Sequence, residues 1–275
     1  MNKVAIMDRS ARYMKGIINK LIPFILALAL MLAFGTSVKA ETAQQTDGKE
    51  NSAIVLEDGT TAASDAEEAA ALLENVKGTY EPLFPVITRP EYDQLWLDPC
   101  IAVLGEEAGP AMAEMLKAAC NGTIYGQEAI DAFGDGSNGA QFDCLFINGV
   151  STITFDGATI SGADENGSQV FNHEYAYVGK LILAGMMEGY LYETADEDAG
   201  EFRYFYMMPD TPATTFHLEF RYGSNTDDLA RYNEGPYAYW LAAGFPVDAD
   251  VEMIKNVITL FCEENLAEEQ AEDAA

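Results

Sequence analysis

Basic residues and histidines are scarce in this sequence. It has 15 lysines and arginines against 45 aspartates and glutamates, a formal net charge of −30, and only 2 histidines. Binding to nucleic acid or to an anionic membrane depends on basic side chains that neutralise phosphates. We therefore expect neither as a partner. A surface this acidic attracts cations, but weakly and without specificity.

The common catalytic motifs are also missing. The sequence contains no G-x-x-x-x-G-K phosphate loop, no G-x-S-x-G nucleophile turn, no H-E-x-x-H zinc motif and no G-x-G-x-x-G after a predicted strand. A catalytic triad would have to use His173 or His217, and no local sequence supports a nucleophile for either of them. We therefore expect that the protein is not an enzyme.

No two of the four cysteines form a C-x-x-C pair, so neither a zinc knot nor a thioredoxin-like redox site is expected. The cysteines are Cys100, Cys120, Cys144 and Cys262. An even number in an exported protein suggests two disulfides, which could be connected in three ways. We favour Cys100 with Cys120, because both flank one predicted helix. Buried free thiols are the alternative.

Residues 1–40 have the pattern of a secretory signal peptide. Basic residues come first, an apolar run follows at 22–35, and small residues lead to Val38-Lys39-Ala40. The apolar run has about 14 residues, short of the roughly 20 that span a bilayer. We expect export to the periplasm or the extracellular space, with no membrane span after cleavage. The residues after Ala40 include 9 basic and 44 acidic ones, a net charge of −35.

Residues 41–63 are polar and aperiodic, which is typical of a flexible acidic tether. A helix is predicted to begin at Ser64, which is spaced from Glu67 as in a capping box. Further helical patterns cover residues 90–97, 106–120, 127–133, 227–232 and 251–264. Asp248 is the expected cap of the last helix. The acidic tail 267–275 is predicted to be disordered, so a single domain is expected over residues 64–266.

Strand-like runs dominate the middle of the chain. They cover residues 142–147, 150–155, 158–160, 169–177, 180–183, 189–193, 202–207 and 214–222. Asn148-Gly149 and Asp156-Gly157 are strong hairpin signals, because a type I′ turn needs positive φ at both central residues. About eight strands in roughly 80 residues indicate a mainly β fold, an antiparallel β-barrel with flanking helices.

Three stretches stand out together. They are Gly78-Thr-Tyr-Glu-Pro-Leu-Phe-Pro85, Phe171-Asn-His-Glu-Tyr-Ala-Tyr-Val-Gly179 and Thr215-Phe-His-Leu-Glu-Phe-Arg-Tyr-Gly-Ser224. In order and spacing over residues 66–265 they resemble the ZinT (YodA) family of exported zinc-recruiting proteins. The first is similar to that family's opening helical segment. The resemblance implies a calycin- or lipocalin-like barrel, Zn²⁺ as the bound ion, and the binding protein of a zinc ABC importer as a partner.

The resemblance implies a metal site of three histidines, of which this sequence keeps one. The family's H-x-H pair falls on Thr215 and His217, and its distant histidine falls on Tyr206. Alternate residues of a strand face the same side, so Glu219 could complete a site with His217. Arg221 would lie on that side too and would neutralise Glu219 in an ion pair. The alternatives are a hydrogen-bonded histidine left from a lost site, or another ligand, such as an organic molecule or a haem held by Tyr206.

His173 is the remaining candidate metal ligand, with a structural role as its alternative. The first functional hypothesis is an exported metal-binding protein that takes up zinc or another divalent cation. The alternative is a non-enzymatic barrel that binds a small molecule after losing the zinc site. A third class is a structural protein whose tether places the barrel in a cell envelope or a secreted assembly.

Overall fold

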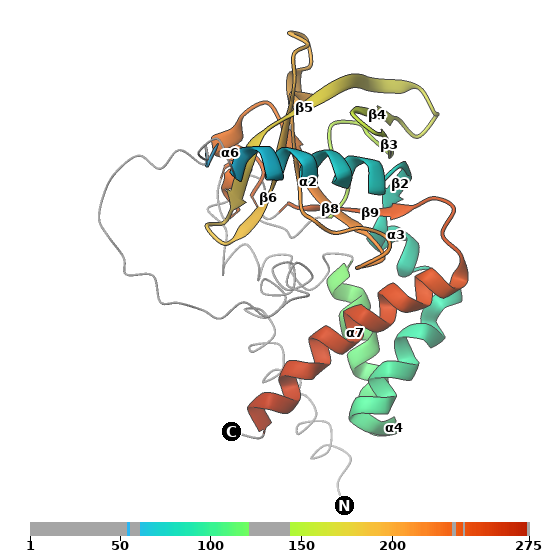
Figure 1. Cartoon of the computed structure of the whole chain (residues 1–275). Coiled ribbons are helices and arrows are strands. Elements are labelled where there is room, and N and C mark those ends of the chain that lie inside the picture. The colour runs from blue at the N-terminus through green and yellow to red at the C-terminus, as the bar shows by residue number, and fades with distance from the viewer. Residues whose placement is uncertain (1–53, 56–60, 121–143, 233–234, 239, 274–275) are drawn as a thin grey trace, which may run out of the picture.

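The computed structural model describes residues 54–55, 61–120, 144–232, 235–238 and 240–273 (Figure 1). The signal peptide predicted over residues 1–40 lies outside them, as do most of the predicted tether and the helix predicted at 127–133. Within the described residues, no helix is both long enough and apolar enough to cross a membrane.

The described chain contains nine strands, most of them in the run β3 to β8, and five α-helices that precede, interrupt and follow that run. The strands are β1 (Ile54–Val55), β2 (Gly78–Pro82), β3 (Thr152–Asp156), β4 (Thr159–Ala163), β5 (Gln169–Leu183), β6 (Met187–Thr194), β7 (Tyr204–Met207), β8 (Leu218–Gly223) and β9 (Ala242–Pro246). The α-helices are α2 (Thr61–Asn75), α3 (Leu83–Ile87), α4 (Asp93–Cys120), α6 (Thr226–Ala230) and α7 (Val251–Asp273). Short 3₁₀ turns, η1 (Pro90–Tyr92) and η2 (Gly200–Phe202), precede α4 and β7.

The strands close into an antiparallel barrel, as the sequence predicts. The order around the sheet is β5-β4-β3-β2-β9-β8-β7-β6, and β6 pairs again with β5, so eight strands complete the ring. The two-residue strand β1 adds to β5 from outside the ring. Every one of these pairings is antiparallel. The predicted mainly β, calycin-like architecture is confirmed.

Turn chemistry explains which strand predictions hold. Gly157, with φ 61°, turns the chain between β3 and β4, as Asp156-Gly157 predicts. The runs at 169–177 and 180–183 are one continuous strand, β5, whose register shifts between Tyr177 and Gly179. Asn148 and Gly149 also have positive φ, but residues 144–147 before them form no strand. The strand predicted at 142–147 is therefore wrong over its described part.

Two barrel strands are missing from the sequence prediction. Residues 78–82, likened to a helical segment, are β2, and the helix α3 begins only at Leu83. Tyr80 is buried in β2, and its hydroxyl donates to the carbonyl of Val76 at 2.8 Å. β9 has the sequence Ala-Ala-Gly-Phe-Pro, whose small residues and proline give no β-branched pattern. Both strands contain glycine and proline, which in a sequence indicate a loop rather than a strand.

Helix ends also differ from the predicted caps. α2 begins at Thr61, so Ser64 lies inside the helix rather than at its cap, and residues 61–63 belong to the helix rather than to the tether. At α7 the cap is Asp250, whose carboxylate accepts the backbone N–H of Met253 at 2.8 Å, rather than Asp248. α7 continues to Asp273, well into the predicted tail. α4 is broken at Gly105, where φ is 78°, between the two predicted helices.

Aromatic rings meet across the barrel core. Phe155 contacts Phe205 and Phe220 edge to face, at centroid distances of 6.4 and 5.9 Å, and Tyr175 lies 5.2 Å from Phe205. These side chains are almost fully buried. Such aromatic packing is unfavourable for the small-molecule alternative, which needs an enclosed space inside the barrel.

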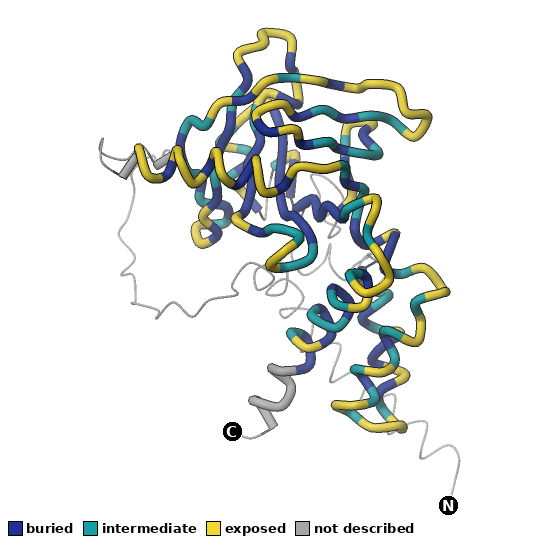
Figure 2. Tube along the Cα trace, turned by 45° about the vertical axis from the view of Figure 1, so that its right-hand side comes forward, coloured by how far each residue is buried: buried dark blue, intermediate teal, exposed yellow. Residues whose placement is uncertain are grey.

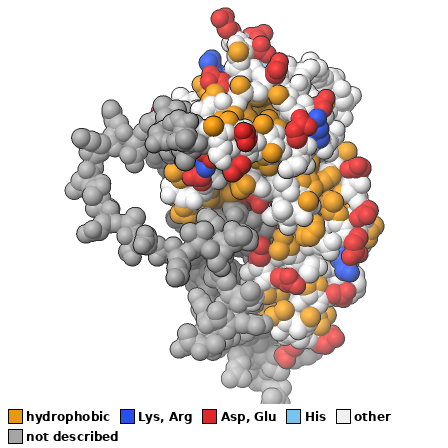
Figure 3. Space-filling model, in the orientation of Figure 1, with side chains coloured by type: hydrophobic (Ala, Val, Ile, Leu, Met, Phe, Trp, Pro, Cys, Tyr) orange, Lys and Arg blue, Asp and Glu red, His pale blue; other side chains and the backbone are white. Residues whose placement is uncertain are grey.

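A second, helical layer covers the outer side of β9. Ala243 and Phe245 of β9 share a buried apolar cluster with α3, α4 and α7. α4 and α7 lie side by side below the barrel (Figure 1), and the helix faces that meet are the buried ones (Figure 2). On the face seen in Figure 3, acidic side chains are spread over both layers and basic ones are few. β8 and β9 therefore lie between the apolar core of the barrel and the apolar cluster of the helical layer.

All four cysteines lie in the described residues, all are buried, and none forms a disulfide in the structure. The predicted link between Cys100 and Cys120 is not formed. Cys100 and Cys120 lie in the two segments of α4, before and after the break at Gly105. Trp96, one turn before Cys100, instead contacts Phe261 of α7, the residue before Cys262, at a ring-centroid distance of 5.6 Å.

Candidate functional site

Glu219 lies on the side of β8 that faces the helical layer, and His217 directly precedes this strand. Glu219 pairs with Ala243 across the ladder, and residues paired in this way share a face. Since Ala243 packs into the helical cluster, Glu219 faces that cluster as well. Both side chains are deeply buried, with exposed fractions of 0% for His217 and 3% for Glu219.

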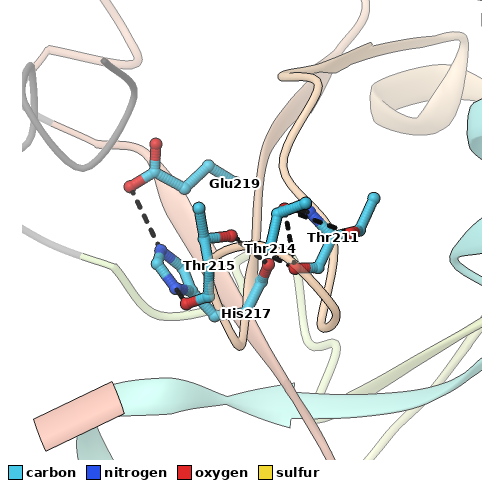
Figure 4. A network of polar contacts seen from close by, with 5 residues as sticks. All are labelled: Thr211, Thr214, Thr215, His217 and Glu219. Atoms are coloured by element: carbon cyan, nitrogen blue, oxygen red, sulfur yellow. Dashed lines mark hydrogen bonds and ion pairs between the residues drawn. The ribbon is translucent and has the colours of Figure 1, made fainter. Parts of the chain in front are cut away.

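The backbone before β8 is bent rather than extended. The strand predicted from Thr214 begins only at Leu218, and Phe216 has φ 66°, in the left-handed region. Thr215 and His217 are therefore not alternate residues of a regular strand. A hydrogen-bonded turn holds the bend, with the hydroxyl of Thr215 donating to the carbonyl oxygens of Thr211 at 3.3 Å and His217 at 3.1 Å (Figure 4).

This bend orients the imidazole of His217. Its Nδ1 lies 2.7 Å from the carbonyl oxygen of Thr215 (Figure 4). A carbonyl only accepts hydrogen bonds, so Nδ1 must carry the proton in this contact. In the neutral ring the lone pair is then on Nε2. That nitrogen is 3.6 Å from Oε1 of Glu219, which is an ion-pair distance and too long for a hydrogen bond.

The carboxylates of two further residues interact electrostatically with His217 and Glu219. Asp210 comes from the loop between β7 and β8, and Glu264 comes from α7. Within the described residues, buried atoms that lack a hydrogen-bond partner include Nε2 of His217 and one carboxylate oxygen on each of Asp210, Glu219 and Glu264. We call these four residues the acidic cluster.

The four groups influence one another electrostatically. Burial and, to a lesser extent, the charge of Glu219 raise the pKa of Asp210 to about 7, and His217 opposes part of the rise. Burial likewise raises the pKa of Glu264 to about 7, with His217 lowering it and Glu219 and Asp210 raising it. For His217, burial lowers the pKa, but Glu219 and the Thr215 carbonyl outweigh it and the net direction is upward. The pKa values of Asp210, His217 and Glu264 therefore depend on the charges of the other members of the cluster.

Tyr206, predicted to replace a family histidine, lies on β7 beside this cluster. Its hydroxyl donates to the carbonyl of Met187 at 2.9 Å, and its ring leaves no room for a Cβ on Gly189. Burial raises its pKa, and the charges of Glu219 and Asp210 add to the rise. The phenol thus stays protonated with its hydrogen bond made, which is unfavourable for a ligand to zinc or haem iron.

The other predicted ligands are placed differently. Thr215 uses its hydroxyl in the turn described above. His173 lies on β5, where its Nδ1 is 2.7 Å from Oδ2 of Asp196, and it is not part of the acidic cluster. The structure therefore brings His217 and Glu219 together and leaves His173 apart.

Arg221 does not play the role predicted for it. Its guanidinium donates to the backbone carbonyls of Leu229, Arg231 and Tyr237. It also lies over the rings of Tyr232, Tyr237 and Trp240 at about 6 Å. The expected ion pair with Glu219 is not among the contacts of this fully buried side chain.

Sequence reasoning missed Asp210 and Glu264. Carboxylates are so numerous in this chain that no single one stands out. One weak signal is that Glu264 follows Phe261 by three residues on α7, at the border of the buried helix face. Asp210 carries no such signal.

The donor types fit a divalent cation, but their spacing does not yet form a coordination shell. Within the described part of the chain, no three His, Cys, Asp or Glu side chains lie close enough together to hold a metal ion as they stand. The buried oxygens and nitrogen without partners are what a cation would satisfy. Binding would require the four side chains to converge.

No family model and no curated protein matches this chain. Among solved structures, it is similar to the Zn(II)-bound ZinT-like domain of Streptococcus pneumoniae AdcA, with 17% identity and a TM-score of 0.41, over 70% of this chain and 89% of that one. It is also similar to Zn(II)-bound AdcA from the same organism, with 16% identity and a TM-score of 0.42, over 69% of this chain. The match spans 35% of that second protein.

Proposed function

We propose that this chain is an exported, non-enzymatic protein that binds a divalent cation at the acidic cluster. The observation that carries the proposal is the set of buried donor atoms without hydrogen-bond partners on Asp210, His217, Glu219 and Glu264. Buried charged groups are unfavourable unless they are paired or coordinate a metal. A divalent cation would serve all four residues together, because each of them offers it a donor atom.

Protons are the competing partner. With pKa values of about 7, Asp210 and Glu264 are close to half protonated at neutral pH. A cation that enters the cluster displaces those protons, since only the ionised carboxylates are ligands. The cluster can therefore hold either protons or a metal ion, and the choice depends on pH and metal concentration.

His217 has the orientation that a metal ligand needs. Metal-binding histidines commonly donate their other ring N–H to a backbone carbonyl, which fixes the ring and its tautomer. The contact from Nδ1 to the carbonyl of Thr215 does this and leaves Nε2 toward Glu219 (Figure 4). We expect His217 and Glu219 to bind first, because both belong to the same short segment.

One imidazole and three carboxylates suit several ions. Zinc accepts nitrogen and carboxylate ligands in a tetrahedral shell, whereas an oxygen-rich set is also suited to manganese. Zinc is the first ion to test, because the family resemblance of the sequence implies it. Transfer of the ion to the binding protein of a zinc importer remains part of this proposal, as does export.

The test is a calorimetric zinc titration of residues 41–275, with His217→Ala and His173→Ala as a matched pair. We expect one ion per chain, bound with micromolar or tighter affinity, and at least tenfold weaker binding in His217→Ala. The other histidine variant should bind as the parent does. Weak binding of several ions that neither substitution changes would show that only the acidic surface attracts the metal. Repeating the titration with manganese decides between the two ions.

A further inference from the structure

Cys100 and Cys262 are brought together from distant parts of the chain. Cys100 lies in α4 and Cys262 in α7, and these helices run side by side in the layer below the barrel (Figure 1). Both side chains have an exposed fraction of 0% and belong to the same apolar cluster. Trp96, one turn before Cys100, contacts Phe261, the residue before Cys262, at a ring-centroid distance of 5.6 Å. The two thiols are also close enough to influence each other electrostatically.

All four cysteines belong to this cluster, so burial alone does not select a pair. Cys100 lies in the first segment of α4, whose Trp96 meets α7 at Phe261, whereas Cys120 is at the far end of the second segment, after the break at Gly105. The effect of Cys100 on the pKa of Cys262 is also larger than that of Cys120. Of the possible pairings, the fold therefore favours one.

We propose that Cys100 and Cys262 form a disulfide in the exported protein, joining α4 to α7. The two thiols lose two protons and two electrons, and a sulfur–sulfur bond forms between them. The electrons and protons pass to a disulfide of an oxidising partner, a small molecule or a protein, which is reduced to two thiols. Exported proteins meet such partners, whereas cytosolic thiols are kept reduced.

The buried position implies that oxidation accompanies folding. Attack by a thiolate needs access to the partner disulfide, and neither sulfur is accessible once the helices are packed. After closure, the same burial protects the link from reductants. A link between residues so far apart in sequence also restricts the unfolded chain strongly.

The link would restrain the part of α7 around Cys262. Glu264 is two residues after Cys262, so holding this turn against α4 also limits how far Glu264 can move. This last consequence rests on the proposed cation site, whereas the disulfide itself does not.

The experiment uses the full chain, expressed with its own leader, recovered from the exported fraction and alkylated before any reduction. Peptide mass mapping is expected to find the Cys100 peptide joined to the Cys262 peptide, with Cys120 and Cys144 alkylated. The Cys120→Ser variant should keep the link, and Cys100→Ser should leave Cys262 alkylated. Mapping of the parent protein needs no variant to fold.

A second readout comes from the purified protein after reduction and unfolding. It is refolded in the presence of oxidised glutathione, so that oxidation can accompany folding. We expect a mass loss of two hydrogens, the same linked peptides and a higher Tm than that of the reduced form. Four alkylated cysteines in the exported protein, or a link from Cys100 to Cys120, would overturn the proposal. Zinc titration of the same samples is read separately, so a failed disulfide and a failed cation site are distinguishable.

Discussion

The barrel core and the acidic cluster are both buried, but they treat polar atoms differently. In the barrel core, tyrosine hydroxyls reach backbone carbonyls, as Tyr80 does with Val76 and Tyr192 does with Ala69, each at 2.8 Å. In the acidic cluster, three carboxylates and an imidazole each retain a buried atom without such a partner. The hydrogen bonds of the tyrosines contribute to stability, whereas the buried atoms without partners in the acidic cluster do not. This contrast is why we propose the cluster, and not the barrel core, as the binding site.

The largest expected effect comes from the barrel core. Phe205→Ala removes a fully buried ring that contacts Phe155, Tyr175 and Phe220, and we expect a loss of about 4 kcal/mol in the free energy of unfolding. Glu219→Gln, in the acidic cluster, should change the metal-free stability by less than about 1 kcal/mol or increase it, since the amide keeps the shape of a buried side chain that has one oxygen without a hydrogen-bond partner. Urea unfolding of both variants measures the difference. Equal losses would erase the contrast between the two regions.

The second effect is the pH dependence of stability in the metal-free protein. The folded pKa of Asp210, about 7, lies above its ordinary value, so between roughly pH 4 and 7 the folded state holds a proton that the unfolded state has lost. The contribution of Asp210 is therefore complete below pH 4 and declines as pH rises to 7, by an amount on the order of 4 kcal/mol.

Comparing the parent with Asp210→Asn isolates this term, because the variant should lose less stability than the parent over the same range. Asp164 offers an opposite control. Backbone N–H groups of Ser168 and Asn166 lower its pKa, so its contribution is present at neutral pH and declines on acidification. A parent and an Asp210→Asn protein with parallel pH profiles would show that Asp210 is not protonated in the fold.

The third effect tests whether α7 takes part in binding. Glu264→Gln keeps the shape of the side chain but removes its charge, and we expect about tenfold weaker zinc binding, or about 1.4 kcal/mol. Glu263→Gln, on the exposed neighbour, should change the affinity less than twofold. Calorimetry at constant ionic strength gives both values. An unchanged affinity in Glu264→Gln would restrict the site to the segment around β8.

The smallest effect separates Tyr206 from the ligands. Tyr206→Phe removes the hydrogen bond to Met187 and should reduce the free energy of unfolding by about 1 kcal/mol. Its zinc affinity should remain within twofold of the parent. A large loss of binding would instead place the phenol among the ligands, as the family resemblance first suggested.

Much of the fold can be predicted from local patterns, because most strands of the barrel are apolar runs bounded by turn residues. β2 and β9 escape, since Pro82 and the Ala-Ala-Gly segment of β9 carry loop signals and become strands only through their neighbours. At the site, His217 and Glu219 can be found because they share one short motif. Asp210 and Glu264 depend on how the β7–β8 loop and α7 pack, which no local pattern encodes. The same is true of the contact between Cys100 and Cys262.

The left-handed backbone at Phe216 has a mechanical consequence. A bulky residue with φ 66° is conformationally strained, by roughly 1–3 kcal/mol, and persists only where its surroundings hold it. Here the Phe216 ring packs on the cluster formed with α7. If α7 moved away, that hold would be lost, the segment could relax toward an extended form, and the His217 ring would lose its orientation. The position of α7 is therefore mechanically coupled, through the strained backbone at Phe216, to the orientation of the His217 ring.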